Sequence, residues 1–404
     1  MSKLHDTFLQ ILACALKGEE APLLPDLADE DWITLSRIAS EQKLLPLFFD
    51  AVYQHAPLQL LRSSVLQQVM LQTIKTDCFL RLYRNWNQAG VYPIVVKGIV
   101  CRSVYNKPDH RPSSDEDVLI APDQIPAAMK VLEEFGMTTP RSDDCPYELP
   151  YRKPNSPLYI ELHKALFDPK SDSYGHWNDL FSHVFDDHYQ VDIQGCEIRT
   201  LAPTDHLLFL ISHALKHFIH SGFGIRQICD IVLFANHFGS EIHWDLLLQQ
   251  CKKIHAELFA ATIFQIGAKY LGFDSDKACY PLNWRGMQVD EANMLEDLFN
   301  GGIYGSTTLG RVHSSNITLD AVAASKADKM VKTSVMGSVF PGCDKLKGTY
   351  PYLRKYPFLL PVAWTQRLIR YGKDIKSGKT ENASVTIEIG NRRVELLRQY
   401  GVIK

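Results

Sequence analysis

Hydrophobic and polar positions alternate with two different periods along the chain. Helical spacing, with apolar residues three or four apart, runs over residues 4–87 and again over residues 204–272. Short apolar and β-branched runs lie between these stretches, at 92–97, 115–120, 147–153, 158–163 and 196–201. This order predicts an α+β fold, in which a mixed β-sheet core is flanked by N-terminal and C-terminal helical regions.

The changes of period divide the chain into four expected regions. They are an N-terminal helical region over 1–88, an α/β core over 89–202, a helical bundle over 203–290 and a C-terminal extension over 291–404. Residues 274–327 look less regular. Residues 384–404 predict a strand or extended stretch followed by a short terminal helix.

The strand predicted at residues 115–120 carries two carboxylates on one face. Side chains alternate along a strand, so Asp115 and Asp117 project to one side, with Cα atoms roughly 7 Å apart, while Glu116 points away. Two carboxylates side by side are costly to hold without a cation. The alternative is that residues 113–115 form a solvated turn.

A third carboxylate comes from the strand predicted at residues 158–163, which places Glu161 and His163 on one face. If the two strands are neighbours, Asp115, Asp117 and Glu161 converge at one spot. Such oxygen ligands suit Mg²⁺ or Mn²⁺. Two such ions about 4 Å apart can activate an attacking oxygen and stabilise a leaving one in phosphoryl transfer. Otherwise, Glu161 is a solubilising charge on an edge strand.

These residues resemble a known family. Lys97-Gly98, the string RPSSDEDVLI that begins at Arg111, and IELH ending at His163 are similar to the strings LKG, RPxxDxDLL and ELHW. Those strings are typical of a bacterial group of nucleotidyltransferases in the polymerase β-like superfamily. The resemblance extends into FPGCDKL and RKYPFLLPVAW, so it covers most of the chain. Two features depart from the broader superfamily: its usual GS is KG here, and the gap from Gly98 to Asp115 is longer.

The resemblance implies a metal-dependent nucleotidyltransferase. Such an enzyme moves a nucleoside monophosphate from an NTP, here expected to be ATP, to a hydroxyl acceptor and releases pyrophosphate. By this resemblance Asp115, Asp117 and Glu161 would be catalytic and would bind Mg²⁺ or Mn²⁺. Glu161 could also take the proton of the acceptor hydroxyl. The acceptor is expected to be a small molecule, a protein or an RNA.

Four neighbouring residues have two interpretations each. Gly98 either lets the backbone approach a triphosphate or forms a simple tight turn. Lys97 ends a buried strand, where an ammonium needs an anion, either the triphosphate or the aspartates. Arg102 and Arg111 are phosphate or acceptor contacts, or salt-bridge partners.

His163 lies on the same strand face as Glu161. It either orients that carboxylate and contacts substrate, or is a satisfied structural histidine.

Two further classes of function are open. A nucleotide-binding regulatory or antitoxin-like module would keep the fold with little turnover, which the missing serine beside Gly98 allows. A zinc hydrolase could use His213 and His217, four residues apart on one helical face, with His220 three further on. However, no glutamate of the HExxH kind is embedded there, so we expect these histidines to face the cleft or solvent.

The composition of the chain indicates the class of protein and the compartment in which it is expected. The chain has 404 residues, of which 46% are hydrophobic and 22% charged, as in ordinary globular proteins of more than one domain. A formal net charge of −3 argues against general DNA or RNA binding. Nine cysteines without a CxxC pair, and no apolar run long enough for a membrane span, predict a cytoplasmic protein.

One basic segment stands out from this balance. Residues 344–379 hold nine Lys or Arg against two Asp, a local balance of +7, with aromatic and proline residues interleaved. Such a surface could meet phosphate, RNA or acidic lipid, or it could be a solvated helix pair packed on the core.

Overall fold

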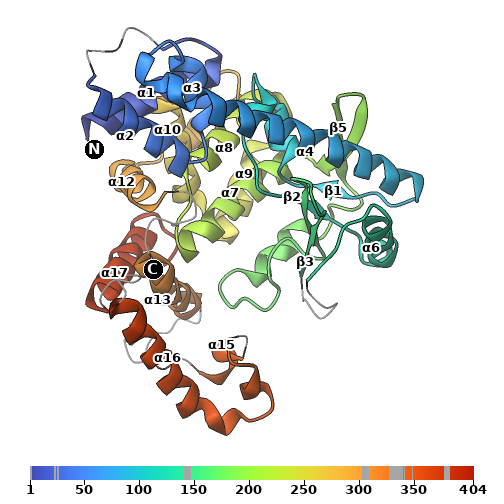
Figure 1. Ribbon diagram of the computed structural model, residues 1–404, viewed down its shortest axis with the longest axis vertical. Helices are drawn as coiled ribbons and strands as arrows, with labels where there is room; N and C mark the ends of the chain where they lie inside the picture. The colour runs from blue at the N-terminus through green and yellow to red at the C-terminus, as the bar shows by residue number, and fades with distance from the viewer. Residues whose placement is uncertain are drawn as a thin grey trace.

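A six-stranded mixed sheet and the helices around it make up the molecule (Figure 1). The computed structural model describes residues 2–21, 24, 27–140, 147–302, 309–326, 340, 342–347, 349–376 and 383–404. The strands are β1 (Ile94–Val95), β2 (Glu116–Leu119), β3 (Glu148–Arg152), β4 (Tyr159–His163), β5 (His188–Ile193) and β6 (Cys196–Leu201), in the order β3-β4-β2-β1-β6-β5. The predicted α+β class is therefore confirmed.

The sheet contains both parallel and antiparallel strand pairs. β1 pairs parallel with β6 and β2 parallel with β4, whereas β1 and β2, β3 and β4, and β5 and β6 are antiparallel. β5 was not predicted. It joins β6 through Gln194 and Gly195, whose φ angles of 53° and 71° are those of a tight primed hairpin turn.

Five helical segments precede the sheet: α1 (Lys3–Lys17), α2 (Asp29–Glu41), α3 (Leu45–Val52), η1 (Ala56–Leu61) and α4 (Arg62–Gln88). The long helix α4 crosses the sheet region in Figure 1. Near its end, the Tyr83 hydroxyl donates to the Pro93 carbonyl at 3.0 Å, and Trp86 Nε1 donates to the Ala128 carbonyl at 3.2 Å. These two bonds fix α4 against the entry to β1 and against α6 (Ile125–Glu134).

Short helical segments connect the strands of the sheet: α5 (Ile99–Ser103), η2 (Pro108–His110), η3 (Pro122–Gln124) and η4 (Gly175–Phe181). After the sheet follow α7 (Pro203–His220), α8 (Ile225–Phe238), η5 (Gly239–Glu241), α9 (Trp244–Lys253), α10 (Glu257–Tyr270), α11 (Leu282–Arg285), α12 (Ala292–Gly301) and α13 (Leu309–Lys326). One hydrophobic core joins α1 to this bundle, and Phe8 and Phe259 both belong to it. The N-terminal helices therefore pack on the bundle as well as on the sheet.

The final helix, α17 (Ala383–Gln399), lies against α13. The strand expected at the start of residues 384–404 is wrong, because tertiary packing overrides the β-branched pattern there. Arg393 is buried and donates to the His220 carbonyl at 2.6 Å, which ties α17 to the end of α7. The irregular stretch expected over 274–327 is wrong for α12 and α13, and its residues 303–308 lie outside the described part.

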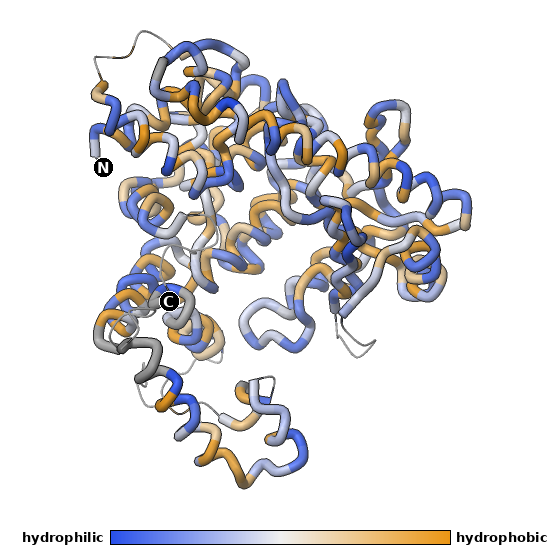
Figure 2. The backbone as a smooth tube through the Cα atoms, in the orientation of Figure 1, coloured by the Kyte–Doolittle hydropathy of each residue, from blue (hydrophilic) through white to orange (hydrophobic). Residues whose placement is uncertain are grey.

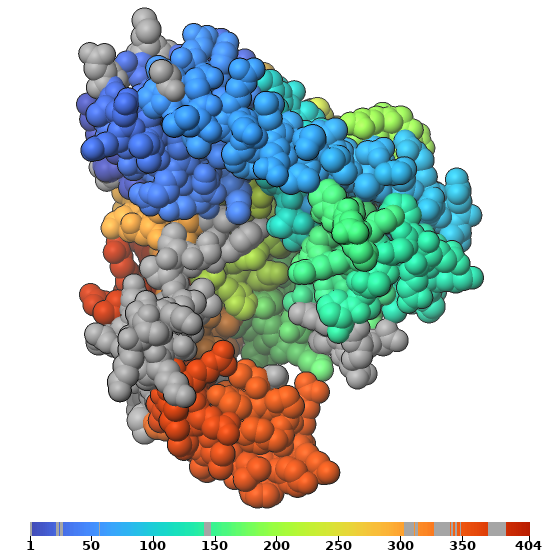
Figure 3. Space-filling model, in the orientation of Figure 1, coloured from blue at the N-terminus to red at the C-terminus, as the bar shows by residue number. Residues whose placement is uncertain are grey.

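The basic segment forms α15 (Cys343–Leu346), η7 (Pro351–Arg354), η8 (Pro357–Leu359) and α16 (Leu360–Lys376). Its buried residues Leu346, Leu353 and Ala363 form a small cluster of their own, and the segment lies at the lower end of the molecule in Figure 3. Hydrophobic and hydrophilic positions alternate along α16 (Figure 2). No helix within the described residues has the length and apolar character needed to cross a membrane.

Candidate active site

The turn between β1 and α5 is formed by Lys97 and Gly98. Gly98 has φ 57° and ψ −115°, a conformation that residues with a Cβ rarely adopt. A Cβ at this position would lie 1.8 Å from Glu116 Oε2. The close approach of this carboxylate requires glycine here.

Glu116 points to the opposite side of β2 from Asp115 and Asp117, as the strand alternation predicts. Its Oε2 accepts the backbone N–H of Ile99 at 2.7 Å, and its Oε1 lies 2.6 Å from Arg102 NH1. Arg102 is buried with it. Of the two interpretations of Arg102, the structure has the salt bridge.

Asp117 and Glu161 lie directly opposite each other on the parallel strands β2 and β4. Asp117 Oδ2 is 3.0 Å from Lys97 Nζ, and its Oδ1 is 3.1 Å from His163 Nε2. The same His163 nitrogen is 3.7 Å from Glu161 Oε2. The two strands therefore bring two carboxylates, an ammonium and an imidazole to one place.

Electrostatics differ among the members of this cluster. Burial opposes ionisation of Asp117, but Lys97 and His163 hold its pKa well below the usual range. Burial raises the pKa of Glu161, the charges of Asp117 and Asp115 add to this, and His163 acts against it. Burial lowers the pKa of His163, yet bonds to Asp117 and Glu161 outweigh it and raise the pKa to about 9. At neutral pH His163 is a cation between two carboxyl groups.

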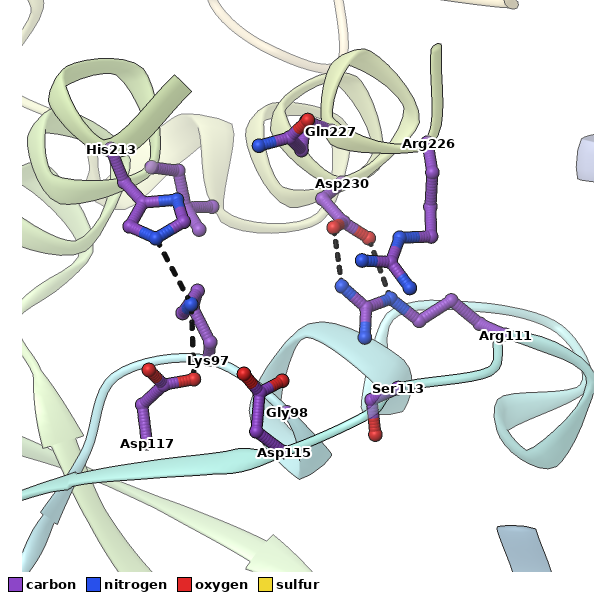
Figure 4. A pocket seen from close by; sticks show the side chains of 11 residues that line it. Lys97, Gly98, Arg111, Ser113, Asp115, Asp117, His213, Arg226, Gln227 and Asp230 are labelled. Atoms are coloured by element: carbon purple, nitrogen blue, oxygen red, sulfur yellow. Dashed lines mark hydrogen bonds and ion pairs between the residues drawn. The ribbon is translucent and has the colours of Figure 1, made fainter. Parts of the chain in front are cut away.

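These residues fit a divalent cation. Asp117, Glu161 and His163 each offer one ligand atom, and these atoms lie within 4.8 Å of one another. The side chains of Lys97 and His163 already supply positive charge at these oxygens, as a bound cation would. Asp115 lies at the start of β2, and its carboxylate points to the same side as that of Asp117 (Figure 4). Carboxylate oxygens suit Mg²⁺ or Mn²⁺, whereas His163 would have to lose its proton before it could act as a ligand.

Helices α7 and α8 form the opposite wall (Figure 4). His213 Nε2 on α7 lies 3.0 Å from Lys97 Nζ. Arg111 binds Asp230 on α8 through two hydrogen bonds, at 2.9 and 2.5 Å, so Arg111 too has a salt-bridge partner. The pocket between the walls has an enclosed volume of about 20 Å³, room for about one water molecule. Most of a nucleotide would therefore lie outside it.

Comparison with known proteins bears on what this arrangement does. The family model of uncharacterised nucleotidyltransferases matches residues 28–272. The chain belongs to this family. The match spans β1 to β6 and the first four helices of the bundle, so it includes every residue of the cluster described above.

Other comparisons add little to the family match. A solved structure, an antigenic nucleotidyltransferase-like protein from Paracoccidioides brasiliensis, is 15% identical, covers 47% of this chain and 90% of its own, and has a TM-score of 0.29. At that score the likeness carries no argument. No curated protein matches the sequence.

In this member of the family the histidines of α7 are arranged differently from a zinc site. His213 contacts Lys97, and His220 Nε2 lies 2.9 Å from the Tyr174 hydroxyl. The close group of three possible ligands among the described residues is on β2 and β4 instead. His213 faces the cleft, as expected.

Sequence reasoning did not identify Asp230 and Gln227 as part of the pocket lining. Asp230 is 119 residues from Arg111, and no local pattern links them. The missed partners lie on α8, which meets the sheet only through the tertiary fold.

Proposed function

We propose that this protein is a metal-dependent nucleotidyltransferase that moves a nucleoside monophosphate from an NTP, expected to be ATP, to a hydroxyl acceptor. The acceptor oxygen would form a bond to the α-phosphorus, the bond from that phosphorus to the bridging oxygen would break, and pyrophosphate would leave. The observation that carries the proposal is the register of Asp117 and Glu161 on neighbouring strands, in a chain that belongs to a nucleotidyltransferase family.

Asp115, Asp117 and Glu161 would hold Mg²⁺ or Mn²⁺. When bound, such an ion supplies positive charge to the reacting phosphate and makes a hydroxyl easier to deprotonate. Glu161 accepts the hydroxyl proton, a role that its raised pKa favours. His163 keeps the two carboxylates at a fixed separation through its contacts with both.

The other site residues position neighbouring groups and do not take part in the reaction themselves. Lys97 contacts Asp117 and His213, so it joins the sheet to α7 at the centre of the cleft. Arg102 and Arg111 hold the loop before β2 through Glu116 and Asp230, and we assign them to positioning. Gly98 allows Glu116 to approach the turn.

The test is transfer of label from each α-labelled NTP with Mg²⁺ or Mn²⁺, alone and with cell extract. Wild type should incorporate label or release pyrophosphate, and Asp117→Asn should lose about 10³-fold or more of the rate, as when a charge-stabilising group is removed. Asp123→Asn, an exposed carboxylate on η3, is the matched control and should keep the wild-type rate. Fractionating the extract then shows whether the acceptor is a small molecule, a protein or an RNA.

A regulatory nucleotide-binding module is the second candidate. It is favoured by the absence of a serine beside Gly98, where the broader superfamily has GS. One result would favour the module: neither wild type nor any variant transfers label, yet wild type binds nucleotide with metal and Asp117→Asn does not. The regulatory module would then replace the transferase as the proposed function.

A further inference from the structure

The helix start that follows Gly98 is not open to a phosphate. Glu116 Oε2 accepts the Ile99 N–H at 2.7 Å and lies where a Cβ of Gly98 would be. A carboxylate at this point repels an anion and already uses the N–H group. If the protein binds an NTP, the polyphosphate needs a cation from another element.

The two arginines near this turn are committed to other partners. Arg102 pairs with Glu116 at 2.6 Å, and Arg111 pairs with Asp230 through its Nε and NH2 groups. All four side chains are buried. Breaking either pair to reach a phosphate would leave a buried carboxylate uncompensated, which is costly.

Lys216 on α7 is in a different position. It comes three residues after His213, on the face of α7 whose His213 Nε2 lies 3.0 Å from Lys97 Nζ. The charges of Asp117, Glu148 and Glu161 also act on it. Its side chain is half-buried, and among the described residues it makes no hydrogen bond or ion pair. An ammonium kept partly out of water without a direct partner is costly unless a ligand compensates it.

The histidines next to Lys216 on α7 add no further positive charge to the cleft. His213 and His217 lie on the same helical face, with ring centroids 4.5 Å apart. Burial lowers the pKa of both well below the usual value, and the charges of Lys97 and Lys216 lower it further, so both are uncharged at neutral pH. Lys216 is the single Lys or Arg of α7, so it carries the ammonium that this helix can offer to an anion.

We propose that Lys216 binds the polyphosphate of the nucleotide from the α7 side of the cleft and favours triphosphates over monophosphates. This inference rests on the proposed function. It assigns to α7 the phosphate contact that the turn at Gly98 does not offer.

The carboxylates near Lys216 affect how a polyphosphate can bind there. The carboxylates of Asp117 and Glu161 lie opposite each other on β2 and β4, and that of Asp115 points to the same side as Asp117. A polyanion would meet an excess of negative charge until a divalent cation adds positive charge. Binding through Lys216 should therefore require Mg²⁺ or Mn²⁺.

Equilibrium binding by calorimetry tests this, with inorganic tripolyphosphate, each NTP and each NMP as probes, in Mg²⁺ and in EDTA. Lys216→Gln should weaken binding of tripolyphosphate and of the preferred NTP about tenfold or more, the usual range for a lost charge-assisted bond, and change NMP binding less than about twofold. Lys216→Arg should restore most of the affinity. Lys252→Gln, an exposed lysine on α9, should match wild type.

Folding is checked separately by the melting temperature. Because Lys216 has no partner to lose, Lys216→Gln should melt at or above the wild-type temperature. A lower melting temperature with equal weakening of NTP and NMP would indicate a structural role and overturn the inference. So would unchanged NTP and tripolyphosphate binding, or wild type that binds neither.

Label transfer separates this result from the proposed function. If wild type transfers label and Lys216→Gln keeps the wild-type KM for the NTP, the inference about Lys216 fails and the transferase stands. If wild type neither transfers label nor binds any nucleotide, the proposed function fails as well.

Discussion

Glu116 and Asp117 are consecutive carboxylates in β2, and both are buried, at 0% and 2% exposed. On the Glu116 side, partners come from fixed elements: a backbone N–H and Arg102 of α5, and Lys75 of α4 at 3.8 Å. On the Asp117 side, Lys97 and Glu161 retain 15% and 25% of their side-chain exposure. One face of the strand is closed and satisfied by the protein alone, whereas the other is open to a ligand.

This difference separates structural charge from functional charge. The closed face has two cations for one carboxylate and no route to solvent. The open face has three carboxylates, those of Asp115, Asp117 and Glu161, beside Lys97 and His163. Like charges held together at an exposed edge attract cations, so the open face is where chemistry is expected.

The largest effect on folding should come from the closed face. Glu116→Gln keeps the size of the side chain but leaves Arg102 and Lys75 without a negative partner. We expect the free energy of unfolding in urea to fall by about 3–5 kcal/mol, as for other broken buried pairs. Adding Arg102→Met should recover part of the loss. A loss below about 1 kcal/mol would mean that this face is not desolvated as described.

A buried group without any charged partner sharpens the comparison. His206 is fully buried, with Nδ1 3.0 Å from Thr200 Oγ1, and burial lowers its pKa to about 4. The unfolded histidine binds a proton below about pH 6.5, and the folded one only below about pH 4. The unfolded state therefore holds more protons between these values, and stability should fall by about 3 kcal/mol as the pH drops across this window.

Urea unfolding of wild type and His206→Gln at several pH values measures this contribution. The variant should lack that part of the acid loss, so the difference in unfolding free energy between the two proteins should narrow from pH 7 to pH 4. His243→Gln, an exposed histidine before α9, should follow the wild-type curve. A constant difference across the window would show that His206 is not kept neutral by the fold.

Gly98→Ala tests how closely Glu116 approaches the turn. The new Cβ would meet Glu116 Oε2 at 1.8 Å, in a backbone with φ 57°. We expect a loss of about 2 kcal/mol, from overpacking and backbone strain together. Gly90→Ala is the matched control, since it has φ 73° and nothing within 4 Å of its Cβ, so it should cost only about 1 kcal/mol.

The cost of Gly98→Ala should shrink toward that of Gly90→Ala when Glu116→Ala is also present. Such coupling is expected for residues in direct contact. Additive losses would contradict the contact between the turn and the carboxylate.

Several of these features could be predicted from the sequence. Alternation along residues 115–120 correctly separates Glu116 from Asp115 and Asp117, and the α+β class follows from the order of periods. The helix α17 could not be predicted from the sequence, because Val385 and Ile387 suggest a strand. Packing on α13 makes this segment helical.

The ion-pair partners of the site residues could not be predicted from local sequence patterns either. Arg111 has Asp230 as its partner, and Glu116 has Arg102 and Lys75, through contacts between elements far apart along the chain. The turn Gln194-Gly195 is the one missed feature with a local signal, since a glycine after a polar residue between two alternating runs favours a hairpin.

The smallest effect on folding should come from the open face, although its effect on activity is the greatest. Asp117→Asn removes the carboxylate that contacts Lys97 and His163, yet Glu161 and Asp115 remain to balance both cations, and water reaches Lys97 and Glu161. The free energy of unfolding should therefore fall by only about 1 kcal/mol, because relief of the repulsion from Asp115 and Glu161 offsets most of the loss of the buried contacts with Lys97 and His163. Urea unfolding beside Glu116→Gln measures it. If Asp117→Asn costs as much as Glu116→Gln, the two faces of β2 are equally structural, and the open face loses its claim to be the site of chemistry.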